Sequence, residues 1–132
     1  MDLVGRMQEL LEAERAGVVC LEQMAFLASD KRMNKVFAQF RNDEGRFCNG
    51  LHRLILERDA APTVTVGAFA EKVMALGDER ERIALLIKGQ AWVVRKIQEI
   101  PPDEMNEEEY KFFIEMRVTH ARNIEICQEL LK

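Results

Sequence analysis

The sequence predicts an all-helical protein in which two antiparallel helical hairpins are joined by a long crossover. Apolar residues recur at steps of three and four along four long stretches, the spacing that places them on the buried face of an amphipathic helix. The three prolines all fall outside these stretches, so none of them would interrupt a helix. A chain of 132 residues is long enough to form one domain, spanning 1–132, with a core of its own.

The first predicted hairpin consists of helices over residues 2–28 and 30–58. Ser29 and Asp30 stand between them, and either side chain could cap the first turn of the second helix. A connection this short places the two helices side by side and antiparallel. Each helix would be roughly 40 Å long.

The segment 59–77 has a different composition and predicts the crossover. Pro62 and the β-branched residues after it indicate an extended linker, and residues 68–76 indicate a short helix that Gly77 would close at its C-cap. A tight turn would not need so long a segment. A connection along the whole bundle would, since an extended chain covers about 3.3 Å per residue.

The second hairpin is predicted over residues 78–100 and 106–131. Both helices begin with the spacing of a capping box, which runs from Asp78 to Glu81 in one and from Asn106 to Glu109 in the other. The pair Pro101-Pro102 ends the first of these helices.

Each predicted long helix carries a polar residue in the middle of its otherwise apolar face: Glu14, Glu44, Gln90 and His120. When each hairpin is folded about its turn, the two polar residues of that hairpin lie within about one helical turn of the same height. A buried polar group costs free energy unless it has a partner. We therefore expect the four side chains to meet in one layer, and this layer is the candidate functional site.

Three glycines lie within three residues of this layer: Gly17, Gly45 and Gly89. A glycine inside a helix costs roughly 1 kcal/mol relative to alanine, so their position needs an explanation. Close packing of the helices is one explanation, and space kept open beside the polar layer is the other.

The stretch 11–17 (Leu-Glu-Ala-Glu-Arg-Ala-Gly) resembles the first helix of rubrerythrin-type proteins of the ferritin-like superfamily. The order of the predicted elements, with a short turn, a long crossover and a second short turn, resembles that superfamily over nearly the whole chain. The resemblance implies a ferritin-like four-helix bundle with a carboxylate-bridged di-iron site in its interior. In such sites two helices each supply one Glu, and the other two each supply a Glu-x-x-His pair.

This di-iron pattern is degenerate here. Glu14 matches the single Glu of the first helix, and Glu44 matches the Glu of the second, but Phe47 stands where the paired His belongs. Gln90 replaces the Glu of the third helix.

On the fourth helix His120 matches, but Arg117 stands where its paired Glu belongs. Two divalent ions in a buried site need about four compensating negative charges, and this layer offers two carboxylates. A full di-iron centre is therefore not expected.

A single iron, zinc or manganese ion stays compatible with the sequence, with Glu14, Glu44 and His120 as ligands. Gln90 or water would complete the coordination. Cys48 follows Glu44 by one helical turn and would add a thiolate, although a lone buried cysteine more often serves packing.

Three functional hypotheses stay open. In the first, which the sequence favours, the layer and Asn123 form a hydrogen-bonded network that is a relic of an ancestral metal site, and the chain is not an enzyme. In the second, the layer binds one metal ion and the protein handles metal, oxygen or peroxide as a metal-dependent oxidoreductase. In the third, the glycines keep open a pocket for a small ligand.

Composition excludes several classes of function. The net charge of −4 gives no basic surface for nucleic acid or an anionic membrane, and no apolar run is long enough to cross a bilayer. The N-terminus lacks the core of a signal peptide, so a cytoplasmic protein is expected.

Cys20, Cys48 and Cys127 show no metal-binding spacing and are expected as reduced thiols. His52 is expected near the surface.

Two parts of the chain are apolar on more than one helical face: residues 18–21 together with 24–28, and residues 91–94. Such breadth indicates burial beyond a one-sided core face. We expect a homodimer through the apolar faces of the helices 2–28 and 78–100, with coverage by the crossover as the alternative.

Overall fold

The computed structural model describes all 132 residues, and its regular secondary structure is entirely helical, without strands. Its helices are α1 (Leu3–Leu27), α2 (Lys31–Glu57), α3 (Phe69–Met74), α4 (Glu79–Gln98) and α5 (Glu107–Leu130), and a short 3-10 helix, η1, spans Pro102–Glu104. The predicted all-helical class is therefore confirmed. The predicted helices are all present, with ends that differ by at most two residues, and η1 was not predicted.

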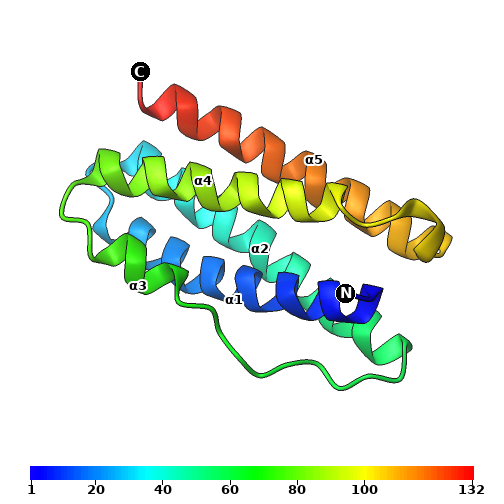
Figure 1. The fold of residues 1–132 in the computed structure, drawn as a ribbon. Coiled ribbons are helices and arrows are strands. Elements are labelled where there is room, and N and C mark those ends of the chain that lie inside the picture. Colours follow the sequence, from blue (N-terminus) through cyan, green and yellow to red (C-terminus); the bar gives the residue numbers. More distant parts are fainter.

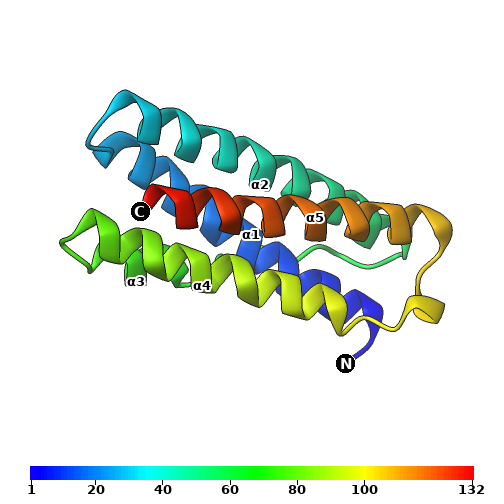
Figure 2. The same ribbon diagram turned by 90° about the horizontal axis from the view of Figure 1, so that it is seen from above.

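The four long helices form two antiparallel pairs. α1 lies beside α2, and α4 lies beside α5 (Figures 1 and 2). After α2 the chain returns along the outside of α1 to the far end of the bundle, where α3 and then α4 begin (Figure 1). As a result α4 runs in the same direction as α2, which a tight turn could not produce.

Side chains of Asp or Asn cap the four long helices at their N-termini. Asp30 rather than Ser29 caps α2, since its carboxylate accepts from the Met33 N–H at 2.8 Å. Ser29 instead donates its hydroxyl to Glu79 at 2.7 Å, which ties the α1–α2 turn to the start of α4.

The two predicted capping boxes have different outcomes. The box of Asn106 and Glu109 is complete. The box of Asp78 is half-formed, because Asp78 caps the helix while the exposed Glu81 side chain makes no return bond.

The predicted C-cap at Gly77 is wrong. α3 ends at Met74, and Ala75 closes it in a right-handed conformation with its N–H bonded to the Glu71 carbonyl. No glycine of the chain has a positive φ, so this turn has no need of the conformational freedom that Gly77 offers.

The crossover is fastened to α1 by hydrogen bonds. The Gln8 side chain accepts from the Thr63 N–H at 2.7 Å, and the Thr63 hydroxyl donates to the Glu12 carboxylate at 3.0 Å. Further along, the Gly67 N–H donates to the Glu12 carbonyl at 3.3 Å. These bonds place α3 against α1 and α4 at one end of the bundle.

The core consists of two apolar clusters, one at each end of the bundle. The first contains residues such as Leu10, Phe47 and Phe113, and the second contains residues such as Leu21 and Phe37. The polar residues 14, 44, 90 and 120 fall between the clusters along each helix. The interior is therefore apolar at both ends and polar in its middle.

The broad apolar faces of α1 and α4 are partly covered from within the chain. Ala70 and Val73 of α3 belong to the second apolar cluster. Near the end of α1, Phe26 stays 88% exposed and Leu27 50% exposed. The homodimer through these faces stays a prediction. None of the helices combines the length and the apolar character needed to span a membrane.

Candidate metal centre

Four different helices bring the predicted polar residues into the interior. Glu14 of α1 and His120 of α5 are fully buried, Glu44 of α2 is 2% exposed and Gln90 of α4 is 3% exposed. Each stands at the point of its helix where the apolar repeat places a side chain inward. The inward orientation of all four follows from the same periodicity that buries their apolar neighbours.

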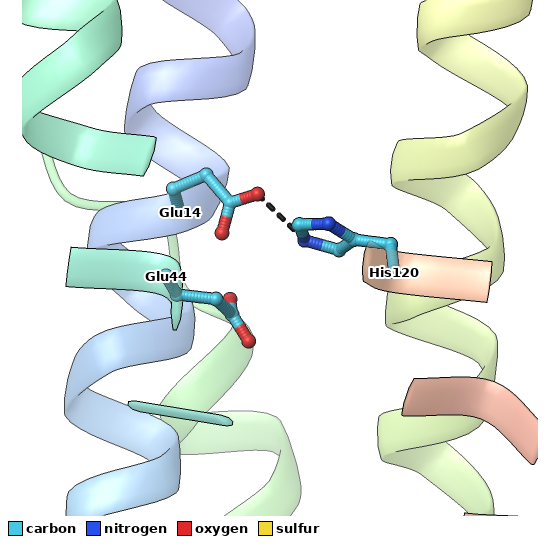
Figure 3. A group of neighbouring side chains, drawn as sticks. All are labelled: Glu14, Glu44 and His120. Atoms are coloured by element: carbon cyan, nitrogen blue, oxygen red, sulfur yellow. Dashed lines mark ion pairs between the residues drawn. The ribbon is translucent and has the colours of Figure 1, made fainter. Parts of the chain in front are cut away.

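Glu14, Glu44 and His120 point toward one another (Figure 3). One potential ligand atom from each lies within 4.8 Å of the other two. His120 Nε2 and Glu14 Oε1 are 2.7 Å apart. Two carboxylates and one imidazole thus converge on a single interior point.

The tautomer of His120 follows from its backbone contact. Nδ1 lies 2.8 Å from the Met116 carbonyl, and a carbonyl only accepts, so Nδ1 carries the hydrogen and donates it. Nε2 is then left with its lone pair on the side of Glu14. Histidines that bind metal through one ring nitrogen commonly donate the other N–H to a backbone carbonyl in this way.

Two further contacts fix the position of Glu44. The Gln90 amide donates from Nε2 to Glu44 Oε2 at 2.9 Å. On the opposite helix a Cβ at Gly17 would lie only 1.8 Å from Glu44 Oε1. Gly17 is therefore needed where it stands, because any larger residue would displace the carboxylate. Gly45, by contrast, has no neighbour within 4 Å of its Cβ position.

Several buried polar atoms of the layer have no hydrogen-bond partner in the protein. They include both oxygens of Glu14, Nε2 of His120, Oε1 of Gln90 and Nδ2 of Asn123. Glu14 Oε1 lies 2.7 Å from His120 Nε2. A protonated Glu14 would donate to this nitrogen, but when Glu14 is ionised both atoms are acceptors and have no donor between them. Buried polar atoms are normally paired, and a group of unpaired ones in one place is expected where an ion or ligand binds.

Burial changes the ionisation of the three side chains. It raises the pKa of Glu14 to about 8. The pKa of Glu44 is raised well above its ordinary value by burial and then by the neighbouring Glu14 carboxylate. Burial also lowers the pKa of His120. Without a cation, the three groups therefore favour their uncharged forms at neutral pH, and a bound cation would favour the charged carboxylates instead.

Asp43 is a further buried polar residue, at the edge of the layer, and the sequence analysis did not identify it. It is 6% exposed, and its Oδ2 has no partner. The Gln39 amide donates to its other oxygen at 3.3 Å, and Arg46 lies 3.7 Å from the same atom. Asp43 precedes Glu44 directly and lies beside the apolar stripe rather than on it, so helical periodicity alone could not place it inside.

Cys48 does not join the site. It is half-buried against the first apolar cluster, and it is not among the residues that converge with Glu14 and Glu44. Burial raises the pKa of its thiol to about 12, so without a cation Cys48 stays a neutral thiol. Arg117 is half-buried and makes no ion pair with either layer carboxylate. His52 is exposed, as expected.

Comparison with known proteins yields one family. Its model, described as a domain of unknown function (DUF6306), matches residues 1–129. No curated protein and no solved structure matches the chain. The chemistry of the site therefore has to be argued from its own geometry.

Proposed function

We propose that this chain, which belongs to the DUF6306 family, binds one divalent transition-metal ion through Glu14, Glu44 and His120. The observation that carries the proposal is the convergence of three buried ligand groups within 4.8 Å. The converging atoms of Glu14 and His120 also lack any hydrogen-bond partner. Binding a cation would satisfy them together.

Charge balance supports a single ion. One divalent cation is neutralised by the carboxylates of Glu14 and Glu44, and a neutral imidazole adds no charge. A second divalent ion would leave about two positive charges uncompensated in a buried site, which is strongly unfavourable. Gln90 is neutral, and Asp43 lies at the edge of the layer. The residues therefore do not fit a complete di-iron centre.

The ligand set favours zinc, iron(II) or manganese, because it consists of carboxylate oxygens and one imidazole nitrogen without a thiolate. The unpartnered Oε1 of Gln90 lies beside Glu44 and could add a further oxygen ligand. Three or four protein ligands would leave a position for a small molecule, so a bound ion could supply Lewis-acid or redox chemistry toward oxygen or peroxide.

The hydrogen-bonded network is the less favoured alternative. A network that served stability alone should pair its members without an added proton or cation, yet when Glu14 is ionised its oxygen and His120 Nε2 face each other as two acceptors, and only Glu44 is paired, with Gln90. We further propose that the fold is a ferritin-like variant. The long crossover and the common direction of α2 and α4 support this kinship.

Elemental analysis of the purified protein tests the proposal. After equilibration with zinc, iron(II) or manganese and removal of excess ion, we expect one ion per chain. Glu14→Gln and His120→Gln should each lower the affinity by more than about 100-fold, because loss of a partner outside the ligand set already costs about 10- to 100-fold. Glu109→Gln is the matched control, since it makes the same change at a buried carboxylate far from the site, and it should bind metal normally.

The behaviour of the variants under chelation separates metal binding from a network. If an ion binds, adding it raises the melting temperature of the wild type but not of Glu14→Gln, and chelator removes most of this difference. A trace of metal that is unchanged in Glu14→Gln would contradict the proposal. So would a stability difference that chelator does not alter.

A further inference from the structure

A cavity of about 490 Å³ opens between α1, α3 and α4, directly beside the polar layer. Its wall includes the rings of Phe69 and Trp92 and the side chain of Leu86. The buried residues Glu44 and Gln90 also line it and form its polar inner end. Its volume lies within the roughly 300–1,000 Å³ typical of sites for small molecules.

Glycine shapes this cavity on its α4 side. A Cβ at Gly89 would lie 2.6 Å from the Phe69 ring, so the absence of a side chain lets the ring lie against α4. The hydrogen bond from the Gly67 N–H to the Glu12 carbonyl holds the preceding crossover in place. The cavity is thus part of the folded bundle rather than a gap beside a loose segment.

The charges around the cavity balance. Lys72 and Lys88 are exposed, while Glu9 and Glu12 of α1 are half-buried. Two cationic and two acidic groups give no preference for a charged ligand. The Glu44 carboxyl at the inner end disfavours anions, and the aromatic and aliphatic wall favours an apolar body.

The inner end offers acceptors. The Gln90 amide directs its Nε2 to Glu44, so Oε1 is the atom left free, and it is buried without a partner. A ligand that reaches this atom has to donate a hydrogen bond. A hydroxyl is the smallest neutral group that donates a hydrogen bond and also fits an apolar body.

We propose that this cavity binds a small neutral alcohol, whose apolar body contacts Trp92 and Phe69 and whose hydroxyl donates to Gln90 Oε1. The proposal goes beyond the metal centre and does not depend on it, because none of these contacts involves an ion. If both proposals hold, the cavity is the side from which a small molecule reaches the metal.

Trp92 provides the readout, since it is the only tryptophan and it lies in the cavity wall. Its fluorescence would be followed in chelator-treated protein during titration with n-hexanol and with the isomer methyl pentyl ether, which lacks the O–H donor. We expect a saturable change with n-hexanol and weaker binding of the ether, by about tenfold, the size expected for one hydrogen bond. Gln90→Met should remove this preference.

Two matched variants test the location. Ala13→Phe places a ring in the cavity wall and should abolish n-hexanol binding, whereas Ala84→Phe makes the same change at an exposed position of α4 and should leave it intact. Glu14→Gln should lose metal but keep n-hexanol binding, so the two proposals can fail separately. Absence of a saturable change in the folded wild type, or equal affinity for alcohol and ether, would overturn the proposal.

Discussion

Glu109 and Glu14 are both carboxylates of long helices, and both are almost completely buried, at 1% and 0% exposure. Their partners differ. Glu109 accepts from Arg58 through Nε at 2.5 Å and Nη2 at 2.7 Å, and from the Asn106 N–H at 2.8 Å. Glu14 lies 2.7 Å from the imidazole of His120 and close to the Glu44 carboxyl, and neither of its oxygens accepts from an N–H donor of the protein.

The pKa values of the two carboxyls are consequently shifted in opposite directions. The hydrogen bonds from Arg58 lower the pKa of Glu109, whereas burial raises the pKa of Glu14 to about 8. Burial alone therefore does not distinguish a structural acid from a functional one. Glu109 already has its counter-charge in the chain, while Glu14 needs either a proton or a cation, which is why the second is the candidate ligand.

The largest expected effect is the pH dependence of the stability of the metal-free protein. Between pH 4.5 and about 8 the folded chain keeps a proton on Glu14 that the unfolded chain releases, so stability falls as the pH rises. The lowered pKa of His120 makes stability rise with pH instead, but only below pH 6.5, the ordinary pKa of histidine. Above that pH the ring is neutral in both the folded and the unfolded chain. From pH 6.5 to 8, chemical denaturation with chelator present should show a loss of about 2 kcal/mol from Glu14, and the raised pKa of Glu44 acts in the same direction.

Glu14→Gln provides the control for this titration. It removes one of the two carboxyls whose pKa is raised, so the slope of stability against pH above 6.5 should become clearly shallower. A profile that is identical in wild type and Glu14→Gln would mean that Glu14 is ionised in the folded chain without a cation.

The second prediction concerns Glu109 and its ion pair with Arg58. Arg58→Met leaves the Glu109 carboxylate buried without its cation, and it should destabilise the protein by about 1–3 kcal/mol at pH 7, less than a fully buried pair because Arg58 is 35% exposed. The wild-type contribution is lost as the pH falls through the lowered pKa of Glu109, opposite in sense to Glu14. Denaturation at pH 7 and in mild acid would measure both, and metal affinity should not change.

The smallest expected effect on stability separates two glycines near the layer. Gly17→Ala forces the Glu44 carboxylate away, since the new Cβ would lie 1.8 Å from Oε1, and it should cost about 1 kcal/mol and most of the metal affinity. Gly45→Ala meets nothing within 4 Å and should stabilise α2 by up to about 1 kcal/mol. Melting temperature and metal content would be measured together. Normal metal binding by Gly17→Ala would show that Glu44 is not a ligand.

The 3-4 periodicity predicted the candidate site because its residues follow the same spacing as the core residues. Glu14, Glu44 and His120 occupy positions that a 3-4 repeat places inside, so their burial could be predicted without coordinates. Asp43 was missed because it lies beside that repeat, and Cys48 was overestimated because one helical turn from Glu44 still leaves it against apolar neighbours. Side-chain direction within a buried face is decided by packing, which spacing does not describe.

The sequence by itself determined the four long helices, the N-caps of the second hairpin and the height at which each helix carries a polar residue, since these depend on local spacing and on a few residues at each helix end. Only the tertiary structure decided that Nε2 of His120 faces Glu14, that Gln90 donates to Glu44, and that α3 closes a cavity beside them. Such relations join residues far apart in the chain. They depend on how the two hairpins and the crossover pack together, so no local pattern contains them.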